Sequence, residues 1–514
     1  MAAAKNDNPA PSGGATANGH RDTATTSSSS STATTTATPQ QQAPVALDII
    51  VVGAGISGLA TAISCVLSGH KVTVFESAKE LLEIGAGLQV TPNATRILQR
   101  WGLLDSSAAA DDGPATTTTD DLAVQTPNLW HTAAEPTSLT VHRYTGTVLA
   151  HEESFDKKMR ARYAAPFLDL HRVDLQRALL ARARSLGVRF RLGEQVEAVV
   201  DDFSSSSFSS SSNTDGDSHH HHHHHKAAVT TKAGETVSAD MVVAADGVWS
   251  KCQTSYLGAE HARPPLPTGD LAYRVVFSMD QLQHSDDEDL RQWVQNPTVH
   301  FWIGPGAHAV GYSMRRGDMY NIVLLVPDNL PDGVSRQPGS LEEMKALFTA
   351  WDPILKRFLD RVETVEKWRL MHREELQSWV NDKGNFVFVG DSCHPMLPYL
   401  AQGANSAVED GAVLGQLLGH IKTTADIPKA LNMYETLRKA RGEAIVRETF
   451  KQRRDFHLPD GPEQEKRDVV FKSQLGKEIE GAFPSRWTCP EVQPWLYGYD
   501  AYREVEDAVA QDPF

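Results

Sequence analysis

The glycine pattern that follows the first apolar run constrains the fold more than any other feature of the chain. A β-branched run at 49–52 ends in a Gly-x-Gly-x-x-Gly sequence, and a helical pattern begins directly after it. The three glycines are Gly53, Gly55 and Gly58. This order is typical of the turn between a buried parallel strand and a helix, where a pyrophosphate approaches backbone N–H groups without interference from Cβ atoms. The pattern therefore predicts a dinucleotide site in an α/β fold.

A second predicted strand at 72–76 supports this interpretation. It ends in Glu76, roughly 20 residues beyond the glycines, where an acid is expected to bind the hydroxyl pair of a ribose. Two other interpretations compete: a strand–helix–strand unit whose glycines only allow close packing, and a membrane span, because residues 47–69 hold a single charge at Asp48. The glycines and the β-branched residues before them favour the dinucleotide site.

The composition argues against several classes of partner. A net charge of −16 argues against nucleic acid, whose phosphates require a basic face, and against attraction to an anionic bilayer. Four cysteines in 514 residues make no disulfide framework and fit no zinc pattern. We therefore expect a reduced, cytoplasmic protein without a metal site.

Two low-complexity segments lie outside the predicted core. Residues 1–46 are mostly Ala, Thr, Ser, Gly and Gln without an apolar stretch, so they predict a disordered tail and not a signal peptide. Residues 204–226 contain many serines and the seven consecutive histidines His219–His225. Metal capture is one interpretation of these imidazoles, but strand-like runs on both sides favour a disordered insertion at the tip of a surface hairpin.

The hydrophobic period changes along the rest of the chain. Alternating apolar runs between 262 and 370 predict an antiparallel sheet domain that is inserted into the dinucleotide-binding domain. The predicted parts are 47–261 and 371–450 for the dinucleotide-binding domain, 262–370 for the sheet domain and 451–514 for a C-terminal extension.

Two further apolar strands end in a Gly/Asp pair, Asp246-Gly247 and Gly390-Asp391. The carboxyl ends of the strands in a doubly wound sheet line one crevice. We therefore expect both pairs to meet the first glycine turn, although they are far apart in the sequence.

With these three motifs the chain resembles the single-component aromatic hydroxylases, which are FAD-dependent monooxygenases, and in particular their fungal branch similar to salicylate hydroxylase. The resemblance covers roughly residues 47–450. It implies a Rossmann-like FAD-binding domain like that of para-hydroxybenzoate hydroxylase, with an inserted antiparallel-sheet domain for the substrate. It also implies that the Asp246-Gly247 pair contacts both FAD and NAD(P)H, and that Asp391 binds ribityl or ribose hydroxyls of FAD.

Other segments agree with the resemblance. Gly87 resembles part of the loop beside the flavin, and Arg172 resembles an arginine that contacts FAD. Gly403 and Ala404 resemble the start of a helix that points its N-terminus at the isoalloxazine ring, where the positive end of the helix stabilises the anionic reduced flavin. One position departs from the pattern: the motif that begins with Asp246-Gly247 usually continues to an arginine, but here it has Gln253. The missing guanidinium concerns nicotinamide recognition more than FAD binding.

The resemblance implies that NAD(P)H reduces FAD and that O₂ then forms a C4a-hydroperoxyflavin, which hydroxylates a small aromatic, phenolic substrate. Arg274 and Tyr312 in the predicted sheet resemble the arginine and tyrosine that related fungal enzymes use for flavin gating and for holding the phenolate, so they are the candidate catalytic residues. Solvation of the arginine and packing of the tyrosine are the alternative explanations. His308 and His394 are candidates for proton handling, with packing near the cofactor as the alternative for His394.

Two alternative functions stay open at this point. The same flavin chemistry serves an epoxidase or another oxidative tailoring enzyme that acts on a polyketide or isoprenoid secondary metabolite, and the fold does not separate these because substrate choice depends on the pocket. A non-catalytic regulator that binds flavin or nucleotide would use the tail and the serine-rich segment for interaction. The oligomeric state is not indicated by the sequence.

Overall fold

The structure of the protein is a computed structural model that describes residues 40–81, 85–105, 127–203, 225–258, 260–284 and 286–514. Three features singled out in the sequence fall in the remaining segments: residues 1–39 of the predicted tail, the serine-rich part of the insertion, and the polyhistidine tract except His225. These features lie outside the described residues.

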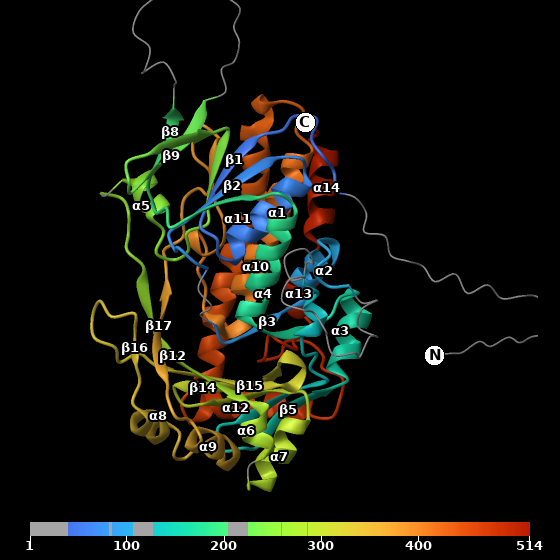
Figure 1. The fold of residues 1–514 in the computed structure, drawn as a ribbon. Helices are drawn as coiled ribbons and strands as arrows, with labels where there is room; N and C mark the ends of the chain where they lie inside the picture. Colours follow the sequence, from blue (N-terminus) through green and yellow to red (C-terminus); the bar gives the residue numbers. More distant parts are fainter. Residues whose placement is uncertain (1–39, 82–84, 106–126, 204–224, 259, 285) are drawn as a thin grey trace, which may run out of the picture. The chain divides into compact units, whose positions relative to one another are not determined.

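A five-stranded parallel sheet carries the glycine turn (Figure 1). Its strand order is β18-β11-β1-β2-β7, and every neighbouring pair is parallel. The strands are β1 (Asp48–Val52), β2 (Lys71–Glu76), β7 (Arg189–Leu192), β11 (Met241–Ala244) and β18 (Phe386–Phe388). Strands β1, β11 and β18 are almost completely buried, which explains why their sequences are continuous apolar runs instead of alternating patterns.

The order of this sheet brings together strand ends that are far apart in the chain. Val52 pairs with Ala244, and Ala244 in turn pairs with Phe388. The first glycine turn and the two Gly/Asp pairs therefore follow three adjacent strands at one edge of the sheet. Because residues 47–69 form a strand, a turn and a helix, their interpretation as a membrane span is wrong.

Helices α1 (Ile56–Leu67) and α10 (Gln402–Gly419) lie in close contact. Glycines of α10 make this approach possible: a Cβ atom added at Gly415 would lie 2.5 Å from the backbone carbonyl carbon of Ser64. Three further helices pack around this pair, α4 (Arg172–Ser185) against α1, and α11 (Ile427–Phe456) and α14 (Ala501–Gln511) against α10.

The predicted substrate domain contributes most strands of a second sheet, which has eight strands. Its order is β16-β17-β12-β15-β14-β13-β4-β5, and its pairs are antiparallel except for β13 with β4. The strands are β4 (Ser138–Arg143), β5 (Val148–Glu153), β12 (Leu266–Ser278), β13 (Thr298–Gly304), β14 (Ala307–Met314), β15 (Met319–Pro327), β16 (Arg336–Pro338) and β17 (Glu366–His372).

Two strands of this sheet come from outside the segment 262–370 that predicts it. Strands β4 and β5 lie more than a hundred residues before that segment in the sequence. Nevertheless, Leu139 of β4 pairs with Val299 of β13, and both residues belong to one apolar cluster. This long-range packing adds both strands to the sheet, and it leaves no local signal in the sequence.

The alternation of side chains along β12 separates a core face from a site face. Tyr273, Val275 and Phe277 are buried in an apolar cluster with residues of the helices α8 (Leu341–Leu347) and α9 (Pro353–Asp360). Arg274 therefore points to the opposite face, because successive residues of a strand face opposite sides of the sheet.

Smaller elements complete the described part of the chain. The predicted hairpin around the insertion is present as β8 (Val196–Phe203) and β9 (Lys226–Thr231), which pair with each other, and β10 (Thr236–Ala239) extends it. Strands β3 (Gly87–Val90) and β6 (Leu168–His171) form a two-stranded sheet. The other helices are α2 (Pro92–Arg100), α3 (Phe155–Tyr163), α5 (Lys251–Leu257), α6 (Met279–Gln283), α7 (Glu288–Gln295), α12 (Pro462–Ser473) and α13 (Gln493–Tyr497), with short 3₁₀ turns η3 (Leu129–His131), η5 (Arg315–Gly317), η6 (Gly390–Ser392), η7 (Pro398–Leu400) and η8 (Thr424–Asp426).

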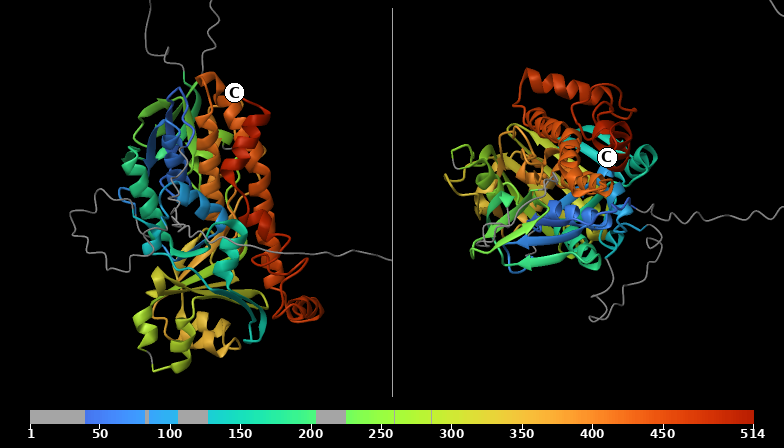
Figure 2. Two further views of the ribbon diagram at one scale, coloured as in Figure 1. Left: turned by 90° about the vertical axis from the view of Figure 1, so that its right-hand side faces the viewer. Right: turned by 90° about the horizontal axis from the view of Figure 1, so that it is seen from above.

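The long helix α11 connects the two large sheets (Figure 2). In its first half, Tyr434 donates a hydrogen bond of 3.1 Å to the carbonyl of Phe388 in the parallel sheet. Near its end, Arg453 pairs with Asp270 of β12. The predicted C-terminal extension therefore begins inside a helix that belongs to the core.

The last residues of the predicted tail are ordered against the core. The side chain of Gln40 donates a 2.7 Å hydrogen bond to the hydroxyl of Ser68, and Ala43 donates through its backbone to the carbonyl of the same serine. The tail thus gives way to ordered structure earlier than residue 46. In the segments that the structure describes, no helix combines the length and the apolar character that crossing a membrane requires.

The contact between α1 and α10 predicts that replacing a helical glycine by alanine destabilises the protein instead of stabilising it. Replacing a helical glycine by alanine normally stabilises a helix by about 1 kcal/mol. Gly415→Ala should instead destabilise the protein by about 1–3 kcal/mol, because the new Cβ atom forces the two helices apart. Chemical denaturation measures the change, and Ala440→Gly on the exposed side of α11 reports the ordinary propensity effect. A stabilised Gly415→Ala variant would show that the helices are not in backbone contact.

Candidate active site

The first glycine turn contains two glycines that the backbone requires and one that it does not. Gly53 has a φ angle of +103°, and a Cβ atom there would lie 2.5 Å from the carbonyl oxygen of Ala245. A Cβ atom at Gly58 would overlap the carbonyl group of Gly53. A Cβ atom at Gly55, in contrast, would meet no atom within 4 Å. Gly55 therefore borders open space at the N-terminus of α1, where backbone N–H groups can receive a pyrophosphate.

A cavity of about 410 Å³ adjoins this turn. Five of the predicted cofactor residues line it, namely Gly53, Gly55, Glu76, Asp246 and Gly247. The carboxylate of Glu76 accepts hydrogen bonds of 2.8 Å from the backbone N–H groups of Ala54 and Ala78, which fix its position. It retains lone pairs for the two hydroxyl groups of a ribose. The cavity and its donors fit the ADP part of a dinucleotide.

Asp246 determines the shape of the second motif. Its carboxylate oxygens accept hydrogen bonds from the hydroxyl of Ser250 (2.6 Å) and from the backbone N–H of Cys252 (3.0 Å). A Cβ atom at Gly247, whose φ angle is +74°, would meet no atom within 4 Å. Asp246 therefore acts through the turn that it holds, and Gly247 leaves the backbone of this turn open to a ligand.

Gln253, the residue that departs from the expected motif, is buried and hydrogen-bonded. Its side chain donates to the carbonyl of Ser392 in the third motif (3.2 Å) and accepts a hydrogen bond from Arg373. Arg373 also donates to the carbonyls of Val248 (2.6 Å) and Arg263 (2.9 Å). A guanidinium from a distant segment thus contacts the second motif, where the sequence pattern lacks its own arginine.

Asp391 in the third motif is exposed, and Arg172 at the start of α4 lies near it. The protein around Asp391 raises the pKa of its carboxyl by desolvation, while the positive charges of His394 and Arg172 act in the opposite direction. Two predicted cofactor residues of opposite charge therefore come together from separate segments of the chain.

A buried ion cluster lies behind this third motif, with Asp410 at its centre. The carboxylate of Asp410 accepts hydrogen bonds from the backbone N–H of Gly390 (2.9 Å), from His394 (2.5 Å) and from Arg438 (2.8 Å). Burial alone would lower the pKa of His394, but the carboxylate of Asp410 outweighs burial and raises it. These contacts correspond to the packing interpretation of His394, since its ring is fully buried.

Helix α10 begins without a side-chain cap. Its N-cap residue is Ala401, which has a φ angle of +51° and offers no side-chain hydrogen bond to the first turn. Gly403 and Ala404 follow, and a Cβ atom at Gly403 would contact only Met396, at 3.7 Å. The first N–H groups of the helix and the positive end of its dipole are therefore available to a ligand.

Tyr312 lies against the segment that carries Gly87. A Cβ atom at Gly87 would overlap the phenol group of Tyr312, and the backbone N–H of Gly87 donates a 2.9 Å hydrogen bond to Asn321. Burial raises the pKa of Tyr312 well above its ordinary value, and the positive charge of Arg274 opposes this rise. The phenol is therefore protonated at neutral pH and is a hydrogen-bond donor.

Arg274 is partly buried beside the same segment. Its guanidinium lies 5.1 Å from the centre of the Trp368 ring but makes no hydrogen bond or ion pair with any residue that the structure describes. Burial lowers the pKa of Arg274, as does the nearby charge of Arg172, while Tyr312 acts in the opposite direction. Arg172, Arg274 and Tyr312 therefore come together from α4, β12 and β14.

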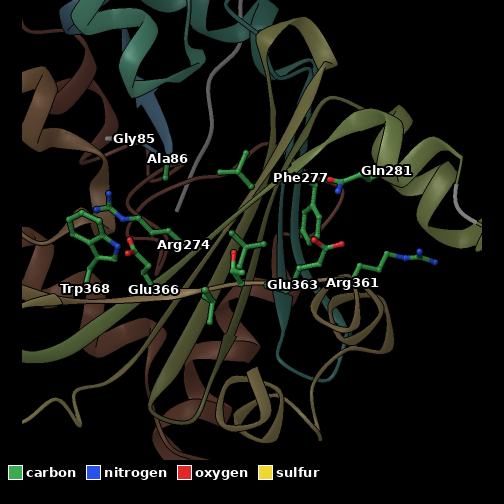
Figure 3. A pocket seen from close by; sticks show the side chains of 14 residues that line it. Gly85, Ala86, Arg274, Phe277, Gln281, Arg361, Glu363, Glu366 and Trp368 are labelled. Carbon is green, nitrogen blue, oxygen red and sulfur yellow. The ribbon is translucent and has the colours of Figure 1, made fainter. Parts of the chain in front are cut away.

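A second cavity of about 410 Å³ adjoins Arg274 (Figure 3). Gly85 and Ala86, which precede Gly87, contribute to its wall. Figure 3 shows Arg274, Glu366 and Trp368 grouped at one end, with Phe277, Gln281, Arg361 and Glu363 toward the other end. Val275, Val276, Val362 and Val365 contribute the apolar part of its wall. The cavity thus combines an unpaired cation with apolar surface.

His308 does not line either of these cavities. Its ring is buried, and its Nδ1 atom lies 2.7 Å from Nε2 of His457. Burial and the neighbouring imidazole lower the pKa of His308 well below its ordinary value. The described contacts therefore give no support to its predicted role in proton handling.

Sequence reasoning missed five residues that shape the site: Asn321, Trp368, Arg373, Asp410 and Arg438. Asp410 gave a detectable signal, because a charged residue at a buried position of an apolar helix requires a partner. The other four act through contacts between distant segments, which no local pattern reveals.

Comparison with known proteins agrees with this geometry. A family model described as an FAD binding domain matches residues 46–449. The FAD-dependent monooxygenase OpS4 of Beauveria bassiana (strain ARSEF 2860) is 47% identical over 90% of this chain and 97% of its own length. The 3-hydroxybenzoate 6-hydroxylase of Polaromonas naphthalenivorans (strain CJ2) is 30% identical over 91% of this chain and 99% of its own. A substrate complex of salicylate hydroxylase matches with a TM-score of 0.66 and 20% identity, covering 90% of this chain and 98% of that chain.

The chain belongs to the FAD-dependent aromatic hydroxylase family. It is an FAD-dependent monooxygenase, so the alternative of a non-catalytic regulator is excluded. The predicted fold class is confirmed by the likeness to salicylate hydroxylase and by the two sheets described above.

The open space at Gly55 predicts that cofactor binding and folding can be separated. Gly55 is the N-cap of α1, and asparagine is a favourable N-cap residue. Gly55→Asn should therefore leave the melting temperature of the cofactor-free protein within about 2 °C, but its side chain should fill the pyrophosphate position and abolish FAD retention. Flavin absorbance and thermal melts measure the two effects. In the control Gly58→Ala, the overlap with Gly53 should lower the melting temperature even without FAD. Full retention of FAD by Gly55→Asn would exclude this location for the pyrophosphate.

Proposed function

We propose that this monooxygenase hydroxylates a small aromatic acid of the hydroxybenzoate type, with NAD(P)H as electron donor and O₂ as co-substrate. The observation that carries the proposal is the unpaired guanidinium of Arg274, which lies beside Tyr312 and lines a cavity that mixes polar and apolar side chains. Relatives of about 30% identity are named for reactions on such acids, among them 3-hydroxybenzoate 6-hydroxylase and 3-amino-4-hydroxybenzoate 2-monooxygenase PtnB3.

Arg274 is suited to the carboxylate of such a substrate. A guanidinium pairs with a carboxylate through two parallel hydrogen bonds, and this geometry fixes the orientation of the aromatic ring. Because Arg274 is partly buried and has no carboxylate partner among the described residues, an anionic ligand would compensate its charge.

Tyr312 is suited to the phenolic oxygen of the ring. Its pKa is raised by burial, so the phenol keeps its proton and donates a hydrogen bond. A donor aimed at the oxygen stabilises the phenolate-like form in which the ring is electron-rich and ready for hydroxylation.

The proposed roles of the cofactor residues follow their positions. Gly53, Gly55 and Gly58 accommodate the pyrophosphate, and Glu76 binds the ribose. Asp246 and Gly247 form the turn that contacts both FAD and NAD(P)H. Gly87 and Arg172 lie beside the flavin, Asp391 binds the ribityl hydroxyls, and Gly403 and Ala404 face the edge of the isoalloxazine ring. When FAD is bound and reduced, it supplies the activated oxygen. The chain orients the substrate, excludes water and keeps the proton of Tyr312 in place.

The cysteines agree with a cytoplasmic enzyme, which is part of this proposal. All four, Cys65, Cys252, Cys393 and Cys489, are free and buried in the structure. Thiols that stay reduced are typical of a reducing compartment.

The proposal predicts distinct kinetic effects for the two candidate catalytic residues. Arg274→Gln should raise KM for an aromatic acid roughly 10- to 100-fold, because a charged hydrogen-bond pair is lost. Tyr312→Phe should lower kcat/KM roughly 10-fold, because it removes one hydrogen bond to the phenolic oxygen. Steady-state NAD(P)H oxidation measures both, with FAD content as the control for cofactor loss. Unchanged kinetics in both variants would exclude these roles.

The substrate class itself predicts the outcome of a screen. Hydroxybenzoates should stimulate NAD(P)H oxidation by the purified flavoprotein, and hydroxylated product should form with little peroxide. Terpenoids and large polyketides should give no stimulation. Stimulation by isoprenoids alone would favour the epoxidase or tailoring alternative. Parallel assays with NADH and NADPH determine which nucleotide is used.

A further inference from the structure

The carboxylate of the cross-strand neighbour of Arg274 binds another arginine. Arg274 of β12 and Glu366 of β17 are paired residues of neighbouring antiparallel strands. Side chains at such positions share one face and have Cβ atoms about 5 Å apart, so opposite charges there normally attract each other. The Oε2 atom of Glu366 instead accepts two hydrogen bonds from Arg336, one from Nε at 3.0 Å and one from Nη2 at 2.5 Å.

The guanidinium groups of Arg274 and Arg336 both lie close to the ring of Trp368. Arg336 of β16 pairs in register with Trp368, and its guanidinium lies 4.2 Å from the centre of that ring. Arg274 lies 5.1 Å from the centre of the same ring. Trp368 therefore holds Arg274 through its face, without a hydrogen bond, while Arg336 binds the carboxylate.

We infer that Arg336 is a positioning residue that occupies Glu366 and thereby leaves Arg274 free to bind the carboxylate of the substrate. This inference rests on the proposed function, because it assigns to Arg274 an anionic ligand. Without Arg336, Glu366 would turn to its cross-strand neighbour Arg274, and a substrate carboxylate would then have to displace an internal one.

The surroundings of the cavity favour this assignment over a general charge effect. Burial and the positive charges of Arg172 and Arg336 lower the pKa of Arg274, while Tyr312 acts in the opposite direction. Arg361 lines the same cavity but lies toward its other end, as Figure 3 shows. Loss of the positive charge at Arg361 should therefore leave Glu366 paired with Arg336.

Binding of a defined probe tests the inference. The probe is 3-hydroxybenzoate, and its uncharged counterpart is 3-hydroxybenzamide, each titrated into the FAD-loaded enzyme while the flavin absorbance is followed. In Arg336→Gln, Kd for the acid should rise about 10-fold, as expected when one charge-assisted hydrogen-bond pair must be displaced. Kd for the amide should change less than about twofold. The double variant Arg336→Gln/Glu366→Gln should restore the affinity for the acid. The control Arg447→Gln, which removes a surface arginine paired with Glu375 away from the cavity, should leave the affinity unchanged.

A second measurement needs no substrate and no turnover. Phenylglyoxal modifies arginine side chains that are not engaged with carboxylates, and peptide mass spectrometry follows its reaction with Arg274. The modification should become several-fold slower in Arg336→Gln and should recover in the double variant. A loss of folding would instead accelerate modification of many arginines at once.

The outcomes separate this inference from the proposed function. If Arg274→Gln binds the acid as tightly as the native enzyme, the proposed role of Arg274 fails. If Arg274→Gln loses the acid but Arg336→Gln binds it normally, or if Glu366→Gln fails to rescue Arg336→Gln in both measurements, the proposed function stands and the positioning role is overturned.

Discussion

The parallel pairing of β18, β11 and β1 determines where the rest of the site lies. Each strand delivers one motif to the same edge of the sheet, because parallel strands end on the same side. The three motifs are then connected to each other by both side-chain and backbone contacts. Gln253 of the second motif bonds to Ser392 of the third, and Ala245, at the end of β11, approaches Gly53 of the first so closely that only glycine fits. A shift of one residue in this pairing would separate all three motifs.

The buried ion cluster behind the third motif stabilises the position of this motif at the same edge of the sheet. Glu409, Asp410 and Arg438 have fully buried side chains, and Arg441 pairs with Glu409 at 2.9 Å. Burial alone would raise the pKa of Asp410, but the charges of His394 and Arg438 outweigh it and hold that pKa below its ordinary value. Such a cluster contributes less to stability than its contacts suggest, because desolvation opposes pairing. Its effect is geometric: it ties α10, α11 and the Gly390 turn to one another.

Much of this arrangement was predictable, because its signals are local. The glycine turn, the acid of Glu76 and the two Gly/Asp pairs each follow an apolar strand, and a strand that ends in such residues can be recognised from a short window. The convergence of these motifs followed from a rule about parallel sheets.

The contacts that sequence could not predict all join distant segments. Strands β4 and β5 enter the second sheet because their apolar faces match β13, and nothing in residues 138–153 specifies that partner. The role of Arg373 is similar, because its three acceptors, Gln253, Val248 and Arg263, lie more than a hundred residues earlier. In the sequence, Gln253 departs from the pattern of its motif. In the structure, it accepts a hydrogen bond from Arg373.

Arg373 has a mechanical consequence for the enzyme. The chain crosses from the parallel sheet to the eight-stranded sheet near Arg263 and crosses back near Arg373, and the hydrogen bond between these two residues fastens both crossings at one point. A motion of these two crossings relative to each other would break the hydrogen bond between Arg373 and Arg263. Since the same guanidinium donates to the Val248 carbonyl, a rotation of the eight-stranded sheet would be transmitted to the turn of the second motif.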